Sequence, residues 1–206
     1  MFNSIFEIIY LILFVGASII RGVMVSRVPQ WWKKKDQIAH SKATGLDMSL
    51  LIISSLGMVL LPMVYIFSKW FDFADYLLPS LLSQILGWMG AAIFVFALYL
   101  LYKSHADMGQ NFSPELALRE EHKLITSGIF GSIRHPMYAA HLVWAMAQIF
   151  LLQNWIAGPS FLLTSLPLYL VRIPSEELMM FQTFKEDYTD YITRTGRIFP
   201  KIRSSR

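Results

Sequence analysis

Five long apolar segments, separated by polar ones, dominate the hydropathy pattern of the chain. They cover residues 5–20, 48–67, 81–102, 137–152 and 156–171. A helix needs about 20 mostly apolar residues to cross the hydrocarbon core of a bilayer, and a lipid-exposed backbone must satisfy its own hydrogen bonds. Because the two-residue alternation of a barrel strand is absent, the pattern predicts an all-α integral membrane protein with five transmembrane helices.

The connections between these segments refine the prediction. Only Gln153, Asn154 and Trp155 join the last two segments, and so short a link predicts an antiparallel helical hairpin over 136–171. Pro62 predicts a kink in the second segment. The first segment has neither a basic leader nor a small-residue cleavage site, which favours a membrane anchor over a signal peptide.

The composition agrees with lipid exposure. Hydrophobic residues make up 55% of the chain and charged residues 16%, whereas a soluble domain carries about 25% charged residues. The chain has no cysteine, which excludes a disulfide framework, a cysteine-ligated metal and a thiol nucleophile. Its five histidines show no metal-binding spacing, so no metal site is expected.

The basic residues predict the orientation. Of the 18 lysines and arginines, 17 fall in segments 21–45, 103–134 and 172–206, and basic loops stay on the cytosolic side. The N-terminus is therefore expected outside and the C-terminus in the cytosol, in a prokaryotic cell membrane or the endoplasmic reticulum. The net charge of +4 is then an orientation signal, and no nucleic-acid partner is expected.

Two polar blocks on the cytosolic side carry the candidate chemistry. The first is the loop 103–134, and the second begins at Arg172 and includes Glu176 and Glu177. Pro174 and the two carboxylates predict a new helix start. The apolar residues that follow have the spacing of one amphipathic face: Leu178, Phe181, Phe184, Tyr188 and Tyr191. Since both blocks face the cytosol, we expect them to meet over the hairpin and form a site.

Ordinary membrane-protein roles explain several of these residues equally well. Arg134 suits a positive-inside loop, Arg172 a side chain that reaches toward the headgroups, and the two glutamates a helix N-terminus. Residues 1–102 are expected to form an N-terminal unit of three spans, and residues 103–206 the unit that holds the site.

From about residue 105 to 200 the chain resembles the isoprenylcysteine carboxyl methyltransferase family, within a wider group that includes membrane phospholipid methyltransferases. The motif Arg-His-Pro-x-Tyr at 134–138, followed by a short-turn hairpin, an arginine and then two glutamates, is its most specific part. The resemblance is carried by 110–111, 122–130, 134–138, Asn154, Arg172, 176–177, Phe184, Tyr188, Tyr191 and Pro200.

The resemblance implies S-adenosylmethionine as methyl donor and the carboxylate of a prenylated cysteine, or a similar lipidated acid, as acceptor. Arg172 would orient that carboxylate. Arg134, Glu177, Tyr188 and Tyr191 are secondary candidates. The residues that would contact the cofactor are Gln110, His122, Lys123, Leu124, Ile125, Phe130, His135, Pro136, Met137, Tyr138 and Glu176.

Three other functions stay open at this point. N-methylation of an ethanolamine phospholipid would need a base, for which Glu177 or His141 is a candidate. A nicotinamide-dependent membrane reductase would need a basic cluster for a phosphate, and only Arg194 and Arg197 suggest one. A non-catalytic membrane scaffold would bind no cofactor.

Overall fold

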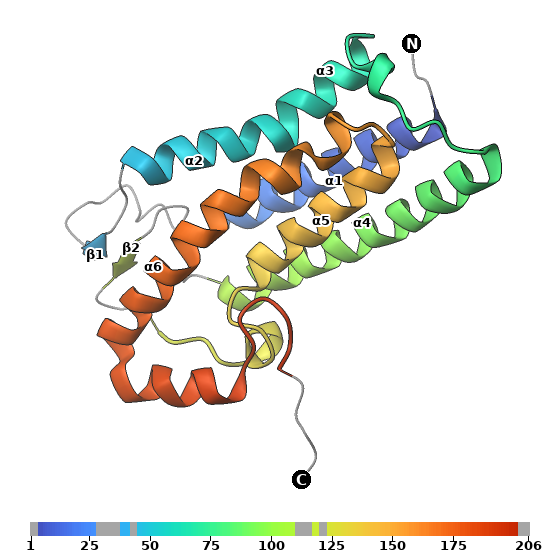
Figure 1. Cartoon of the computed structure of the whole chain (residues 1–206). Helices are drawn as coiled ribbons and strands as arrows, with labels where there is room; N and C mark the ends of the chain where they lie inside the picture. Colours follow the sequence, from blue (N-terminus) through green and yellow to red (C-terminus); the bar gives the residue numbers. More distant parts are fainter. Residues whose placement is uncertain (1–3, 28–37, 42–44, 110–116, 120–122, 202–206) are drawn as a thin grey trace.

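The computed structural model describes residues 4–27, 38–41, 45–109, 117–119 and 123–201, and its long helices lie side by side as a bundle (Figure 1). The helices are α1 (Ile5–Ser26), α2 (Gly45–Ser55), the π-helical η3 (Leu56–Leu60), α3 (Leu61–Phe67), the 3₁₀ helix η4 (Asp72–Ala74), α4 (Ser80–Met108), the 3₁₀ helix η6 (Gly128–Gly131), α5 (Pro136–Leu152) and α6 (Ala157–Arg194). Two short strands, β1 (Ile38–Ser41) and β2 (Ala117–Arg119), pair antiparallel in segments expected to be loops.

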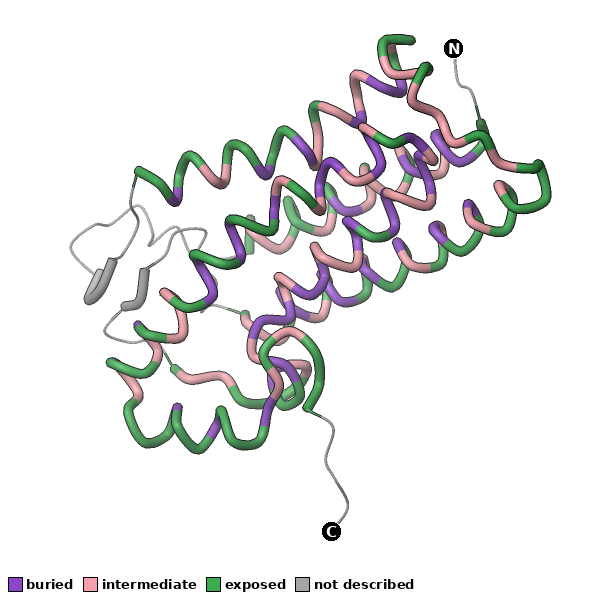
Figure 2. The backbone as a smooth tube through the Cα atoms, in the orientation of Figure 1, coloured by how far each residue is buried: buried purple, intermediate pink, exposed green. Residues whose placement is uncertain are grey.

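The helical membrane architecture agrees with the prediction. Within the described part of the chain, three helical runs are long and apolar enough to cross a membrane: Ile5–Ser26, Gly45–Phe67 and Ser80–Met108. The shorter α5 is also apolar. The residues coloured as buried lie mainly where these helices face one another, and exposed residues lie on the outer faces of the bundle (Figure 2). Large apolar residues such as Ile12 and Leu81 are exposed. Outer faces of this kind suit lipid better than water.

The interruption in the second apolar run takes the form of η3, directly before Pro62. Proline has no N–H to donate to the carbonyl four residues earlier, here that of Met58, and the Tyr10 hydroxyl donates to this carbonyl instead, at 3.3 Å. The neighbouring Gly57 carbonyl accepts a hydrogen bond from Ser160 Oγ at 2.8 Å. Side chains of adjacent helices thus replace the bonds that the helix loses, as an apolar environment requires.

Gln148 of α5 is the centre of this polar network. Its side chain is fully buried. The amide nitrogen donates to the Ala157 carbonyl at 2.7 Å and to Ser160 Oγ at 3.0 Å, while Oε1 accepts from the Tyr10 hydroxyl at 2.9 Å. One side chain therefore connects α1, α5 and α6, and through Ser160 the η3 segment.

The predicted tight link between α5 and α6 has a clear local cause. Gln153 ends α5 in the left-handed conformation, with φ 48°, and Asn154 Oδ1 accepts the backbone N–H groups of Ile156 and Ala157 at 3.0 and 2.9 Å. This capping starts α6 at once, so the two helices run antiparallel (Figure 1).

The expected helix start at Pro174 is wrong, because α6 continues through that residue. Pro174 leaves the Leu170 carbonyl without its helical N–H donor, and Ser175 Oγ donates to the next carbonyl, that of Val171, at 2.9 Å. The backbone leaves helical geometry only at Lys185, with φ 46° and ψ −112°. This bend divides the expected apolar face: Tyr188 and Tyr191 are buried, whereas Leu178 and Phe181 are exposed.

Gly57 tests whether this close packing matters for stability. A Cβ at Gly57 would overlap the Ser160 backbone carbonyl, so we expect Gly57→Ala to lower the free energy of unfolding by about 1–3 kcal/mol. Gly22→Ala is the matched control, since nothing lies within 4 Å of its Cβ position and alanine favours helix. Thermal unfolding in detergent measures both, and equal effects would contradict the packing argument.

Candidate functional site

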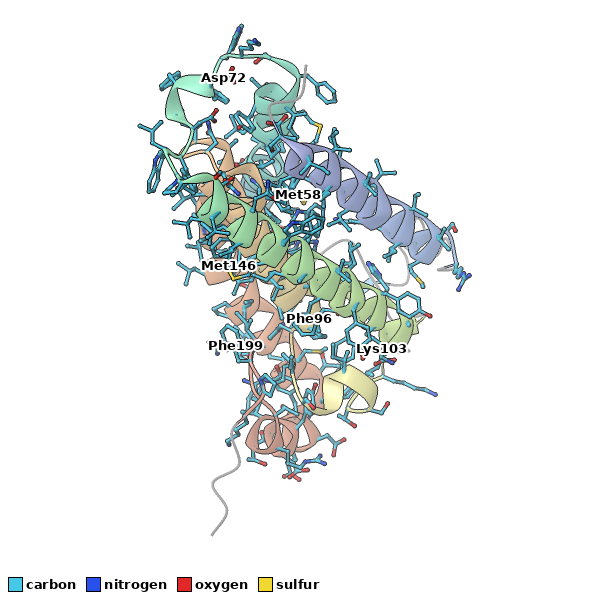
Figure 3. All side chains as sticks on the ribbon, turned by 90° about the vertical axis from the view of Figure 1, so that its right-hand side faces the viewer. Met58, Asp72, Phe96, Lys103, Met146 and Phe199 are labelled. Carbon is cyan, nitrogen blue, oxygen red and sulfur yellow. The ribbon has the colours of Figure 1, made fainter. Side chains whose placement is uncertain are left out.

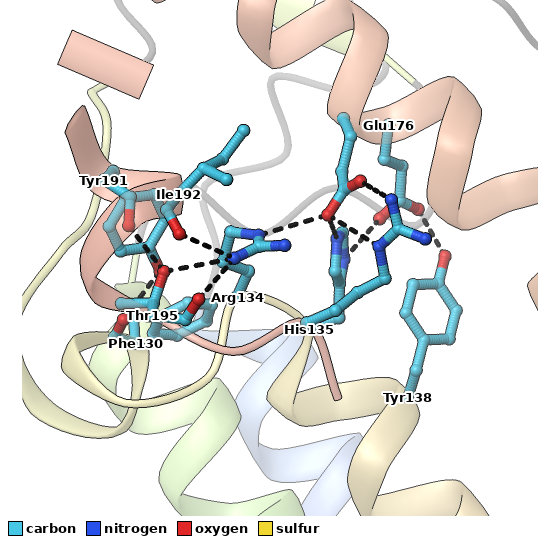
Figure 4. Close-up of polar contacts among 10 residues, drawn as sticks. Phe130, Arg134, His135, Tyr138, Glu176, Tyr191, Ile192 and Thr195 are labelled. Atoms are coloured by element: carbon cyan, nitrogen blue, oxygen red, sulfur yellow. Dashed lines mark hydrogen bonds and ion pairs between the residues drawn. The ribbon is translucent and has the colours of Figure 1, made fainter. Parts of the chain in front are cut away.

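The segment before α5 and the segment after α6 lie against each other. Their backbones form a parallel bridge between Ile133 and Gly196. The Arg134 N–H donates to the Gly196 carbonyl and the His135 N–H to the Arg197 carbonyl, each at 2.9 Å. This pairing brings the Arg-His-Pro motif beside the two glutamates of α6 (Figure 4), so the expected meeting of the polar blocks is present where the structure describes them.

Glu177 is surrounded by cations. Its Oε1 lies 3.1 Å from Arg134 Nε, 3.3 Å from His135 Nε2 and 3.1 Å from Arg197 Nε. Burial by itself would raise the pKa of Glu177, but hydrogen bonds from His135, Arg197 and Arg134 outweigh it and lower the pKa to about 2. This carboxylate is therefore ionised and engaged on several sides.

Glu176 has a different environment from its neighbour. Its side chain is 26% exposed, against 12% for Glu177. The Tyr138 hydroxyl donates to Glu176 Oε1, His135 Nδ1 lies 3.4 Å from Oε2, and Arg172 Nε lies 3.8 Å from Oε1. Glu176 is thus the carboxylate of the pair that remains partly open to a ligand.

His135 connects the two glutamates through its two ring nitrogens. Burial disfavours the imidazolium, but the hydrogen bonds and charges of Glu176 and Glu177 outweigh burial and raise the pKa of His135. A protonated ring donates from both nitrogens, so the raised pKa and the bridging geometry agree.

Arg172 is nearly buried and pairs with a residue that the sequence analysis missed. Asp47 of α2 places Oδ1 3.2 Å from Arg172 Nε. The available signal was an acidic residue at the N-terminal boundary of the second apolar segment, among basic neighbours. Ionisable groups at such boundaries need a partner, and Arg172 is that partner.

A second missed residue, Asp107, positions the loop before α5. Its Oδ2 accepts the Ile129 N–H at 2.8 Å. Gly128 adopts a positive φ of 60°, and a Cβ there would overlap the Asp107 carboxylate. Asp107 thereby holds η6 against the end of α4.

The remaining candidates are divided among several environments. Phe130 is buried, and its carbonyl accepts a hydrogen bond from the Tyr191 hydroxyl at 2.6 Å; Tyr188 is also buried. Pro136 and Met137 begin α5. Leu124 and Ile125 are half-buried and Lys123 is exposed, whereas Gln110 and His122 lie outside the described residues. Among the described residues, no group of three or more histidines and carboxylates could hold a metal ion.

Comparison with known proteins identifies the part of the chain that carries this site. Residues 89–182 match the sequence model of the isoprenylcysteine carboxyl methyltransferase (ICMT) family. Residues 89–182, here the ICMT segment, are therefore similar to that family. Arg134, His135, Arg172 and the two glutamates lie inside the matched segment, and Asp47 lies outside it.

Individual proteins show the same likeness. The protein-S-isoprenylcysteine O-methyltransferase of Dictyostelium discoideum is 33% identical over 118 residues, which are 56% of this chain and 50% of that protein. The human protein of that name is 29% identical over 141 residues, 66% of this chain and 50% of the relative. The chain spans about half the length of these relatives.

A solved structure shares the fold. The eukaryotic intramembrane Ras methyltransferase ICMT, solved without a monobody, aligns with a TM-score of 0.50 at 22% identity, over 77% of this chain and 52% of that one. The likeness supports the helical membrane architecture of the ICMT segment.

The charge of His135 gives a pH prediction. An ordinary histidine has a pKa of about 6.5. The contribution of the His135 imidazolium to stability is therefore fully present below that pH, and it is lost as the pH rises through the raised pKa of the folded state. The Hε1 resonance of His135 should titrate above 6.5 in detergent, and Glu177→Gln should lower that midpoint. Asp190→Asn, at an exposed ion pair with Arg194, is the control that should leave it unchanged. A wild-type midpoint below 6.5 would mean that burial dominates.

Proposed function

We propose that this chain is an S-adenosylmethionine-dependent membrane methyltransferase that methylates the carboxylate of an isoprenylated cysteine or a similar lipidated acid. One observation carries the proposal: Arg172 and Glu176 lie one turn apart on α6, just after its apolar part, within the ICMT segment. A cation and a partly open carboxylate are therefore adjacent where an apolar tail in the bilayer and a polar molecule from the cytosol can meet.

The residues present fit the proposed cofactor. S-adenosylmethionine has an ammonium group, which a carboxylate such as Glu176 pairs with by a charge-assisted hydrogen bond. Its cationic sulfur is attracted to aromatic faces. The Tyr138 hydroxyl donates to Glu176, and the Tyr138 ring lies beside that of Tyr169 with centroids 5.1 Å apart. When bound, the cofactor would supply an electrophilic methyl group.

The chain's own contribution is orientation and charge. A terminal carboxyl group has a pKa of about 3.5 and is ionised at neutral pH, so its methylation needs no general base. The planar guanidinium of Arg172 can hold a carboxylate through two nitrogens, and alignment of the reacting atoms lowers the barrier.

Features of the site disfavour the rival functions. N-methylation of an ethanolamine phospholipid requires removal of a proton, and Glu177, with its pKa near 2, is a poor base at neutral pH. His141 packs its ring against Trp144 and Phe161. A reductase would need basic residues for a phosphate, but Arg194 pairs with Asp190 and Arg197 with Glu177.

The proposal extends to the arrangement of the chain in the membrane. α5 and the apolar part of α6 supply the fourth and fifth spans of the five-span arrangement. Asp72 and Lys103 lie at opposite ends of the bundle (Figure 3), and the charge bias assigns the Lys103 end, with the site, to the cytosol.

A transfer assay separates the acceptors. Purified protein with methyl-labelled S-adenosylmethionine is given either a farnesylated cysteine analogue or a phosphatidylethanolamine. We expect label in a base-labile methyl ester of the cysteine analogue. Label in the amine alone would refute carboxyl methylation, and no label in either acceptor would refute both methyltransferase functions.

Two variants separate the cofactor from the acceptor. We expect Glu176→Ala to weaken S-adenosylmethionine binding by about 1–3 kcal/mol, the loss of a charge-assisted hydrogen bond. Arg172→Ala should spare cofactor affinity and instead raise the KM for the lipid or lower kcat. Calorimetry in detergent measures the affinities, and loss of cofactor binding in Arg172→Ala would show that its assigned role is wrong.

A further inference from the structure

A nearly buried ion pair joins α6 to a helix that lies outside the ICMT match. The side chains of Arg172 and Asp47 are 9% and 8% exposed, and Asp47 Oδ1 lies 3.2 Å from Arg172 Nε. The matched segment, 89–182, contains the arginine and not its partner. α2 therefore adds to the site a charge that the family match does not include.

Helix stability alone does not account for Asp47. A carboxylate in the first turn interacts favourably with the helix dipole, and Asp47 occupies that turn of α2. An exposed side chain would gain this benefit without leaving water, however. Removing a carboxylate from water is costly unless a cation compensates it, so the burial of Asp47 is explained by its pairing with Arg172.

The packing of α2 directs Asp47 at Arg172. Asp47, Leu50, Leu51 and Ser54 have the spacing of one helical face, and these residues are buried or half-buried while their neighbours are exposed. Leu50 and Leu51 pack against the part of α6 that flanks the arginine, formed by Leu168, Tyr169 and Ile173. Apolar contacts thus set the rotation of α2, and the carboxylate lies on the docked face.

The edge of the Arg172 guanidinium that Asp47 approaches indicates the role of Asp47. A guanidinium can meet carboxylates at its side edge, which includes Nε, or at its end edge between the two Nη atoms. Asp47 and Glu176 both approach Nε, at 3.2 and 3.8 Å. The contact with Asp47 is an ion pair that is not aligned as a hydrogen bond. We propose that Asp47 is a positioning residue: its charge keeps the Nε side of the Arg172 guanidinium against α2 and so limits the orientation of its plane, and the end edge then receives the carboxylate of the lipid substrate. This inference rests on the proposed function.

A positioning role predicts a particular kinetic pattern. Without Asp47 the guanidinium keeps its charge and still attracts an anionic lipid, but its plane is no longer fixed, so the reacting oxygen is poorly aligned. Turnover should therefore fall while the lipid KM does not rise, since a repelling carboxylate has also been removed. Cofactor affinity should not change, because the ammonium partner is Glu176.

Asp47→Asn removes the charge and keeps the size of the side chain. In the carboxyl-transfer assay we expect kcat to fall about tenfold or more, as for other losses of alignment, with no rise in the lipid KM. The Kd of S-adenosylhomocysteine, by calorimetry, should stay within about twofold of wild type. Asp47→Glu restores the carboxylate and should recover most of kcat. Asp190→Asn, an exposed acid in a surface ion pair, should leave every value unchanged.

A second measurement does not depend on activity. The ¹⁵N-detected Nε–H of Arg172, assigned with Arg172→Lys, should exchange slowly with water in the wild type and in Asp47→Glu, and faster in Asp47→Asn. If Asp47→Asn does not fold, the measurement on the wild type still tests the proposal. Exchange of the Arg172 Nε–H as fast as that of the exposed Arg194 Nε–H would overturn it.

Other results of these assays would contradict the positioning role of Asp47. An unchanged kcat in Asp47→Asn, a raised KM with intact kcat, or a parallel loss of S-adenosylhomocysteine binding would each overturn the positioning role. An inactive wild type would overturn the proposed function together with this inference, whereas an active wild type with a normal Asp47→Asn variant would overturn the inference alone.

Discussion

The need to satisfy polar groups inside an apolar bundle shapes this molecule. Pro62 and η3 leave carbonyls of the second apolar run without helical partners, and Tyr10, Gln148 and Ser160 supply the missing donors. Without such donors each buried carbonyl would carry a desolvation cost. The polar contacts hold this run against α6, and its N-terminal half, α2, then brings Asp47 to Arg172. A defect in one helix is thereby linked to the arrangement of a charged site several turns away.

The two adjacent glutamates have different surroundings. Glu177 contacts cations from both flanking segments and ties the chain before α5 to the chain after α6. Glu176, one residue earlier, faces Tyr138 and Arg172 and keeps part of its surface open. Successive positions of a helix point in directions about 100° apart, which is enough to make one carboxylate a structural anchor and the other a candidate ligand-binding group.

The sequence allowed the helices and much of the site to be predicted. Apolar length located the long helices, and the short link at 153–155 predicted the hairpin. The resemblance pointed to His135, Tyr138, Arg172 and the glutamates, which lie together. The helix start at Pro174 was wrong because α6 continues through the proline: a proline suits the first turn of a helix, but its presence does not show that a helix begins there. Asp47 and Asp107 were missed because their partners are distant in sequence, and neither hydropathy nor local spacing reports a contact made only by folding.

The return of the chain to residues 132–135 has a consequence for biogenesis. Synthesis proceeds from the N-terminus, so Glu177 is made before Gly196 and Arg197, whose backbone and side chain complete its surroundings. Until those residues leave the ribosome, Glu177 lacks one of its cations and the segment before α5 lacks the strand-like partner that holds it. Assembly of the charged site is therefore a late event, which follows insertion of the helices and cannot be completed by a nascent chain that stops short of Arg197.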